Sequence, residues 1–141
     1  CLGNKNKKEK DALESYGKNL GLAFQIADDA LDYFSTKTIF GKEIGKDFYE
    51  GKTTMPLIII FQRANNEERN FLREIFKKKK RNEDDFSETL SLINKYKAVE
   101  VSFKRAEYFV NVSYDALGIF QYSEEKKVLQ NLAEFSLNRS F

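Results

Sequence analysis

The sequence predicts an all-α fold, a bundle of helices. Its 141 residues include one proline and seven glycines, too few turn-forming residues for a protein of many short strands. Hydrophobic residues make up 41% of the chain and aromatic residues 14%, enough to bury a core in one domain. Apolar residues recur at steps of three and four, the period of an amphipathic helix. We therefore expect one all-helical unit with six helices and no strand.

The first expected helix covers about residues 11–33. Its apolar residues are spaced by three and four positions: Leu13, Tyr16, Leu20, Phe24, Ala27 and Leu31. This spacing places them along one side of a helix. Gly41 and Gly45 interrupt the pattern, so residues 34–51 are expected to form a loop.

The middle of the chain is expected to hold three shorter helices. Thr53 and Thr54 are suited to cap a helix that has Pro56 in its first turn and continues through LIIIFQRA. A second helix is expected over about 66–77. The charged sequence KKKKRNEDD then forms a solvated connection to a third helix over 87–96.

The C-terminal part of the chain carries the most regular pattern. The residues that step by four and three are Val99, Phe103, Ala106, Val110, Ser113, Leu117 and Phe120. They predict a long helix packed lengthwise on its neighbours. Ser123, followed by Glu124 and Glu125, is a suitable N-cap for a last helix. The residues of that helix expected to face the core are Val128, Leu132 and Phe135.

Charge and cysteine content exclude several classes of protein. The 24 basic and 22 acidic residues nearly cancel, so the net charge of +2 gives no argument for a nucleic-acid partner. No window approaches the ~18 consecutive apolar residues that stable membrane insertion needs. The single cysteine, Cys1, cannot form an internal disulfide. A soluble, cytoplasmic protein is the expectation.

Three carboxylates interrupt the apolar sequence GLAFQIADDALDYF at residues 21–34. Gln25, Asp28 and Asp32 follow one another at steps of three and four, and Asp29 lies about 100° further round the helix. Like charges four residues apart cost roughly 0.2–0.5 kcal/mol even on an exposed helix, and more where water is scarce. Such an arrangement calls for a counter-charge.

Magnesium is the natural counter-charge for these carboxylates. It takes one or two carboxylates, keeps several waters and completes its shell with phosphate oxygens. The absence of histidine argues against zinc, and the spacing of the acids does not fit an EF-hand. A solvated acidic face remains an alternative to a metal site on these residues alone.

The loop sequence GKEIGKDFYEGKTTMP, residues 41–56, adds positive charge shortly after the carboxylates. Lys42 and Lys52 beside a magnesium-loaded acidic group suit a diphosphate, because lysine acts on phosphate as a point charge. The alternative is that these lysines only neutralise the three aspartates or solvate the loop.

FQIADDALD at 24–32, followed by GKEIGKDFYEGKTTMPL at 41–57, resembles the second aspartate-rich motif and downstream loop of the trans-isoprenyl diphosphate synthases, the polyprenyl synthetase family. FSLNRS near the end of the chain resembles the arginine-bearing tail of many members. The resemblance implies an isoprenoid synthase fold that holds Mg²⁺ on an allylic diphosphate. Ionisation releases diphosphate, isopentenyl diphosphate attacks the allylic cation, and loss of a proton completes a head-to-tail condensation.

The resemblance also assigns roles to residues of the motif. Asp28 and Asp32 correspond to metal ligands, with Asp29 bound more indirectly, through water or the loop lysines. Gln25 supports the site beside the reacting carbons. The residues implied to hold the allylic diphosphate are Lys42, Lys52 and, if the tail folds over the cavity, Arg139. Otherwise Arg139 is a surface charge at a frayed helix end.

One part of the family pattern is missing from the chain. The first aspartate motif and the basic residues that hold isopentenyl diphosphate are absent, so residues 1–141 are expected to be the C-terminal portion of an isoprenoid synthase domain. The complete enzyme is expected to be a homodimer, and this chain alone to be inactive. An alternative is a non-catalytic diphosphate-binding subunit or remnant that requires a separate N-terminal half. A terpene cyclase is disfavoured, because its second metal motif usually mixes Asn, Ser or Thr with the acids.

Overall fold

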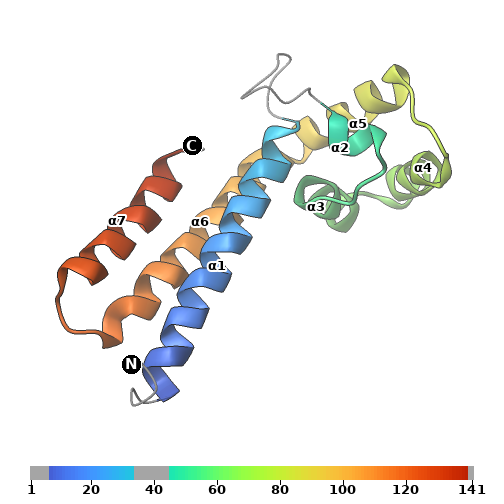
Figure 1. The fold of residues 1–141 in the computed structure, drawn as a ribbon. Helices are drawn as coiled ribbons and strands as arrows, with labels where there is room; N and C mark the ends of the chain where they lie inside the picture. The colour runs from blue at the N-terminus through green and yellow to red at the C-terminus, as the bar shows by residue number, and fades with distance from the viewer. Residues whose placement is uncertain (1–6, 34–44, 140–141) are drawn as a thin grey trace. The chain divides into compact units, whose positions relative to one another are not determined.

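The computed structural model describes residues 7–33 and 45–139, without the side chains of 136–139. These residues are helical and contain no strand, so the all-α prediction is confirmed (Figure 1). In chain order the elements are α1 (Lys7–Leu31), α2 (Lys46–Tyr49), α3 (Met55–Arg63), α4 (Asn66–Lys77), α5 (Glu83–Lys95), α6 (Ala98–Ala116), the 3-10 turn η2 (Leu117–Ile119) and α7 (Glu124–Arg139).

The contacts of the chain divide it into two compact units. One unit comprises Cys1–Gln25 with Lys104–Phe141, and the other is the continuous segment Ile26–Phe103. The first therefore holds most of α1, the later part of α6 and all of α7. The second holds the end of α1 and the helices α2 to α5.

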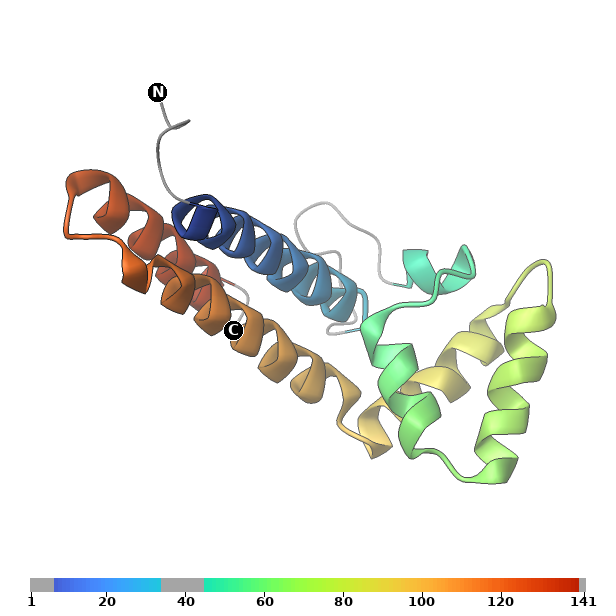
Figure 2. The ribbon, with the colours of Figure 1, turned by 90° about the horizontal axis from the view of Figure 1, so that it is seen from below.

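In the first unit, α7 runs back alongside α6 and α1 (Figures 1 and 2). The hydroxyl of Tyr16 on α1 donates to the carbonyl of Leu129 on α7 at 2.8 Å. The prediction that Ser123 caps the last helix is confirmed, because its Oγ accepts from the amide of Lys126 at 3.0 Å. The Nζ of Lys126 donates to the carbonyl of Phe120 at 2.7 Å and ties the start of α7 to the preceding turn.

The expected inward face of α7 is wrong. The exposed fractions are 63% for Val128, 44% for Leu132 and 62% for Phe135. The helix instead packs through Ala133, which is fully buried, and Leu129, which is half-buried. These two residues lie one position along from Val128 and Leu132, so the helix is turned by about 100° from the expected orientation.

The second unit is built around an apolar cluster with an aromatic centre. Its buried members are Ala30, Tyr33, Phe48, Leu57, Ile59, Ile60, Leu72, Ile75, Ile93, Ala98 and Val99. Phe48 is fully buried and meets the rings of Phe76 and Phe86 edge to face, at centroid distances of 5.5 Å and 5.4 Å. Such aromatic pairs add stability beyond the burial of their area. Phe48 anchors the short helix α2 in this cluster.

Two capping boxes set the boundaries of α4 and α5. Asn65 and Glu68 exchange side-chain and backbone hydrogen bonds at the start of α4, and Asn82 and Asp85 do the same for α5. The helix α4 covers the predicted residues. The helix α5 begins at Glu83, four residues before the expected start, because the capping box draws the acids of the expected linker into the first helical turn.

The loop expected over residues 34–51 contains a helix in its described part. Residues 46–49 form α2, a single turn between two glycines of positive φ, Gly45 and Gly51. The sequence of α2 is too short to show a helical period, which is why the loop prediction is wrong there.

Glu68 joins α4 to α5 and gives a testable pH dependence. Its carboxylate accepts from Lys95 Nζ at 2.7 Å, from the Tyr96 hydroxyl and from the Asn65 amide at 3.0 Å. The hydrogen bonds from Lys95, Tyr96 and Asn65 lower the pKa of Glu68 from 4.5 to about 2.

We predict that Glu68→Gln lowers the free energy of unfolding at neutral pH. A depressed carboxyl pKa stabilises the folded state above the unfolded-state pKa, and this stabilisation is lost as pH falls. The difference between wild type and variant should therefore shrink as pH falls from 4.5 towards about 2. Urea unfolding at a series of pH values measures it. A difference that stays constant over that range would contradict the prediction.

Candidate functional site

The predicted acidic residues lie at the C-terminal end of α1, in three different environments. Asp28 is exposed, whereas Asp29 and Asp32 retain only 6% and 1% of their accessible surface. Asp32 follows the last helical residue, and its amide donates to the Asp29 carbonyl at 3.3 Å. The three carboxylates thus do not form one solvated stripe.

The position of these carboxylates is electrostatically unfavourable. The C-terminal end of a helix carries partial negative charge, which favours cations, and the last turn of α1 has no basic residue. Burial of Asp29 and Asp32 removes the water that would stabilise their ionised forms. Helix dipole, like charge and desolvation therefore all act against the ionised acids.

A glycine returns the chain to the end of α1. The amide of Gly45 donates to the Asp32 carbonyl at 3.1 Å, and Gly45 adopts a left-handed conformation with φ 81°. A Cβ at this position would lie 2.9 Å from Cε1 of Phe86. Only glycine fits this backbone without strain.

A second turn brings Lys52 to the carboxylates. After α2, the Gly51 amide donates to the Phe48 carbonyl and the Lys52 amide to the Asp47 carbonyl, both at 2.9 Å. Gly51 has φ 77° and allows the chain to reverse. Lys52 Nζ then lies 3.4 Å from Asp29 Oδ1, with 47% of the lysine side chain still exposed.

This ion pair compensates the acids only in part. Burial raises the pKa of Asp29, Lys52 lowers it, and the negative charges of Asp47 and Asp28 raise it, with a net increase above the usual value. Asp28, Asp29 and Asp47, together with Asp32 at the same end of α1, are called the carboxylate cluster below. Asp47 was not singled out from the sequence, although it is buried beside Asp29.

Arg81 holds α2 in place and corrects the prediction of a solvated connection. Its Nε donates to the Phe48 carbonyl at 2.9 Å, and its Nη1 donates to the Lys78 carbonyl at 2.8 Å. The guanidinium also lies 5.4 Å from the centre of the Phe76 ring. Nearby, Lys78 pairs with Asp85 at 2.9 Å. The sequence KKKKR did not reveal these roles, because composition does not show which of its five basic side chains make specific contacts.

Two buried hydroxyls adjoin the carboxylate cluster. Tyr33 and Thr54 retain 4% and 1% of their surface, and neither hydroxyl has a hydrogen-bond partner among the described residues. Burial raises the pKa of the Tyr33 phenol, as does the charge of Asp32, while the nearby Thr54 hydroxyl acts in the opposite direction. The sequence singled out Thr54 only as a helix cap, and it did not single out Tyr33.

The other predicted site residues are not brought to the cluster by the described coordinates. Gln25 is exposed on α1, three residues before Asp28. Lys42 lies outside the described residues. Arg139 is the last residue of α7, and its side chain also lies outside the described part.

The donor chemistry of the cluster fits magnesium, although no closed cage is present. Among the residues that the structure describes, no three acidic, cysteine or histidine side chains converge closely enough to hold an ion by themselves. Magnesium does not need such a cage, because it binds one or two carboxylates and takes the remaining ligands from water and phosphate. An exposed acid beside buried ones and a lysine matches that requirement.

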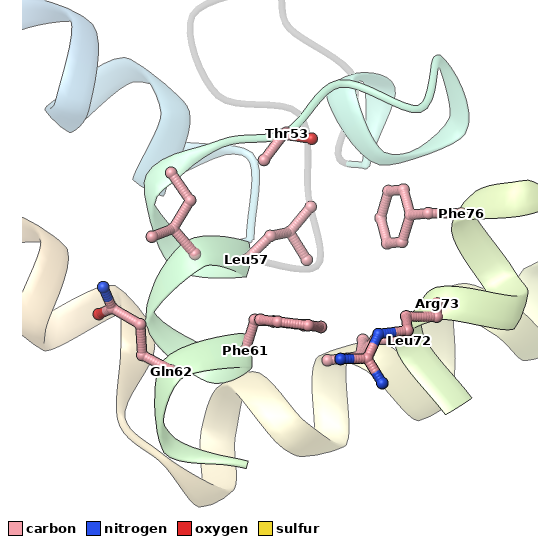
Figure 3. Close-up of a pocket in the computed structure, with 8 residues that line it drawn as sticks. Thr53, Leu57, Phe61, Gln62, Leu72, Arg73 and Phe76 are labelled. Carbon is pink, nitrogen blue, oxygen red and sulfur yellow. The ribbon is translucent and has the colours of Figure 1, made fainter. Parts of the chain in front are cut away.

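A separate apolar hollow of about 300 Å³ lies between α3 and α4 (Figure 3). Its lining is Thr53, Leu57, Ile58, Phe61, Gln62, Leu72, Arg73 and Phe76. The Arg73 guanidinium lies 5.1 Å from the centre of the Phe61 ring. The lining contains no carboxylate, so this hollow is distinct from the carboxylate cluster.

Solved structures place this fold among the prenyl diphosphate synthases. The decaprenyl diphosphate synthase of Rhodobacter capsulatus matches 99% of this chain and 43% of its own, with 31% identity and a TM-score of 0.86. The polyprenyl synthase of Caulobacter crescentus, complexed with calcium and isoprenyl diphosphate, matches 96% of this chain and 42% of its own, with 36% identity and a TM-score of 0.80.

Sequence comparison gives the family. The polyprenyl synthetase family model matches residues 1–93. The octaprenyl diphosphate synthase of Haemophilus influenzae is 34% identical over 133 residues, which are 94% of this chain and 40% of that protein. The chain belongs to the polyprenyl synthetase family, as the resemblance implied, and it spans about two fifths of the length of the curated relatives it matches. None of the described helices has the length and apolar composition needed to cross a membrane.

Gly45→Ala tests whether this turn requires glycine. The left-handed backbone and the contact with Phe86 should lower the free energy of unfolding by about 1–3 kcal/mol. Gly17→Ala is the matched control, because a Cβ there meets nothing within 4 Å on helix α1. The control should be neutral or raise stability by roughly 0.5–1 kcal/mol. Urea unfolding of both variants checks the difference, and equal effects would contradict it.

Proposed function

We propose that the chain is the C-terminal portion of an isoprenoid synthase domain in a magnesium-dependent trans-prenyltransferase. The complete enzyme would condense isopentenyl diphosphate head to tail with an allylic diphosphate. The observation that carries this proposal is the buried carboxylate cluster at the C-terminal end of α1, with Lys52 3.4 Å from Asp29. A cation and a bound diphosphate relieve that arrangement, whereas a purely structural role leaves its cost unexplained.

The proposed roles follow from exposure and charge. Asp28 is exposed, whereas Asp29 and Asp32 are buried. Its carboxylate is therefore the most accessible oxygen donor to a metal ion. Asp32 and, less directly, Asp29 complete the acidic side of the site. Bound magnesium supplies the positive charge that stabilises diphosphate as it leaves.

Lysine side chains would hold the diphosphate itself. Lys52 pairs with Asp29 yet remains half-exposed, so its ammonium can contact a phosphate oxygen without leaving the cluster. Lys42 and Arg139 are proposed to add charge to the same diphosphate, and Gln25 to contact the reacting carbons. These roles rest on the family resemblance, because the described coordinates do not bear on them.

The names of the relatives support the substrate class. They include an octaprenyl diphosphate synthase and short chain isoprenyl diphosphate synthases. The complex of the Caulobacter crescentus synthase with calcium and isoprenyl diphosphate supports a divalent cation beside a diphosphate. A homodimeric, cytoplasmic complete enzyme remains part of the proposal.

Removal of the exposed carboxylate of Asp28 should abolish metal-dependent binding without unfolding the chain. We predict that Asp28→Ala weakens magnesium-dependent binding of farnesyl diphosphate at least tenfold in calorimetry, while helicity by circular dichroism is unchanged. Asp11→Ala is the matched control, an exposed aspartate on the same helix, and should bind as wild type. Equal binding by both variants, or loss of helicity in Asp28→Ala, would overturn the role of Asp28.

Turnover separates the enzyme from the alternative of a diphosphate-binding subunit. The chain carries one aspartate motif and spans about two fifths of its relatives, so we predict magnesium-dependent binding with little or no elongation of farnesyl diphosphate by isopentenyl diphosphate. Radiolabelled isopentenyl diphosphate and product extraction measure it. Efficient elongation by the 141-residue chain would contradict the expected inactivity.

A further inference from the structure

Two hydroxyls near the carboxylate cluster are buried without a hydrogen-bond partner among the described residues: Tyr33 Oη and Thr54 Oγ1. Buried hydroxyls are nearly always paired, with protein or with ordered water. An orphaned pair in one place therefore indicates a missing bond between the two, or a water that joins them to a third group.

Thr54 occupies a position where its hydroxyl would ordinarily bond to its own helix. It is the N-cap of α3, and N-cap threonines usually accept from an amide of the first turn. Here the side chain makes no capping hydrogen bond. The Thr54 hydroxyl is instead close enough to the Tyr33 phenol to lower its pKa. Thr54 is at the N-cap position, as predicted, but its side chain does not make the expected capping hydrogen bond.

Tyr33 is held with its hydroxyl near the acids. Its ring stacks on that of Phe86, with centroids 6.0 Å apart and planes inclined by 19°. The charges that act on its phenol are, in decreasing order, those of Asp32, Asp47 and Asp29. The Tyr33 hydroxyl is therefore within electrostatic reach of these three acids.

We propose that Thr54 and Tyr33 are positioning residues that orient the carboxylate of Asp32 through a chain of hydrogen bonds. The Thr54 hydroxyl donates to Tyr33 Oη, and the Tyr33 hydroxyl donates through one buried water to Asp32. Each hydroxyl then has a partner, and the chain ends on a negative charge, where donors bind most strongly. The inference rests on the proposed function for the use of Asp32.

The proposed chain also fixes Lys52 relative to Asp32. Thr54 follows Lys52 by two residues, and Tyr33 follows Asp32 directly. A bond between the two hydroxyls therefore links the end of α1 to the start of α3 at the point where lysine and carboxylate must meet one diphosphate.

The test removes each hydroxyl and keeps the shape of the side chain. Tyr33→Phe preserves the ring that stacks on Phe86, and Thr54→Val preserves the volume of threonine. The matched controls are Tyr122→Phe and Thr53→Val, at exposed positions. Thermal unfolding of the single and double variants forms a double-mutant cycle, which isolates the coupling between the two hydroxyls.

We expect both single variants to lower the unfolding temperature, and the double variant to lower it by clearly less than the sum. Removing truly unpaired hydroxyls would instead leave stability unchanged or raise it, because a buried polar group without a partner is unfavourable. Unchanged or raised unfolding temperatures, or additive effects, would overturn the hydrogen-bond chain. The controls should unfold as wild type.

A second measurement separates positioning from stability alone. Calorimetry with magnesium and inorganic diphosphate should show roughly three- to tenfold weaker binding by Tyr33→Phe and Thr54→Val at a temperature where both are folded, which corresponds to about 0.7–1.4 kcal/mol. Unchanged binding would overturn the positioning role even if the cycle shows coupling. If the wild-type chain does not bind magnesium and diphosphate, the proposed function fails, and the role assigned to Asp32 fails with it. The double-mutant unfolding cycle would still decide whether the two hydroxyls are coupled.

Discussion

The burial of carboxylates at the C-terminal end of a helix is the constraint on which this site depends. Asp29 and Asp32 lose their water there, the helix dipole opposes them, and Asp28 and Asp47 add like charge. In the described part of the chain the half-exposed Lys52 pairs with Asp29, and the pKa of Asp29 remains above its usual value despite that contact. A cation bound at this site would stabilise the ionised acids, which is the basis of the proposed metal-binding role.

The chain around these carboxylates is arranged by two glycine turns and by the anchoring of α2. Gly45 and Gly51 permit the two turns that bring Lys52 back to Asp29. Arg81 fixes α2 through its carbonyls, away from the cluster, and Phe48 anchors the same turn in the aromatic core. The positive charge beside Asp29 therefore comes from Lys52, whose half-exposed side chain can reach a ligand.

The hydrophobic period predicted the long helices that pack on one side. It missed features that leave no repeating apolar pattern in the sequence. The period located α1 and α6, because each repeats its apolar step over several turns, whereas α3 was predicted from its threonine caps and Pro56. It missed α2, which is a single turn, and the early start of α5, which depends on a capping box inside a charged run. It misjudged the buried face of α7, because an apolar stripe does not say which neighbour the helix meets. Residue type and spacing brought Lys52 and the aspartates together as a hypothesis, whereas the burial of the Tyr33 and Thr54 hydroxyls emerged only from the three-dimensional structure.

The most direct test of the central claim is the stability of the chain as a function of magnesium. A ligand that binds only the folded state raises stability with its concentration. Chemical unfolding at pH 7 should show a midpoint that rises when magnesium and inorganic diphosphate are added together, beyond the effect of sodium chloride at equal ionic strength. A midpoint that responds to magnesium and diphosphate no more than to sodium chloride would contradict a cation-binding role for these buried carboxylates.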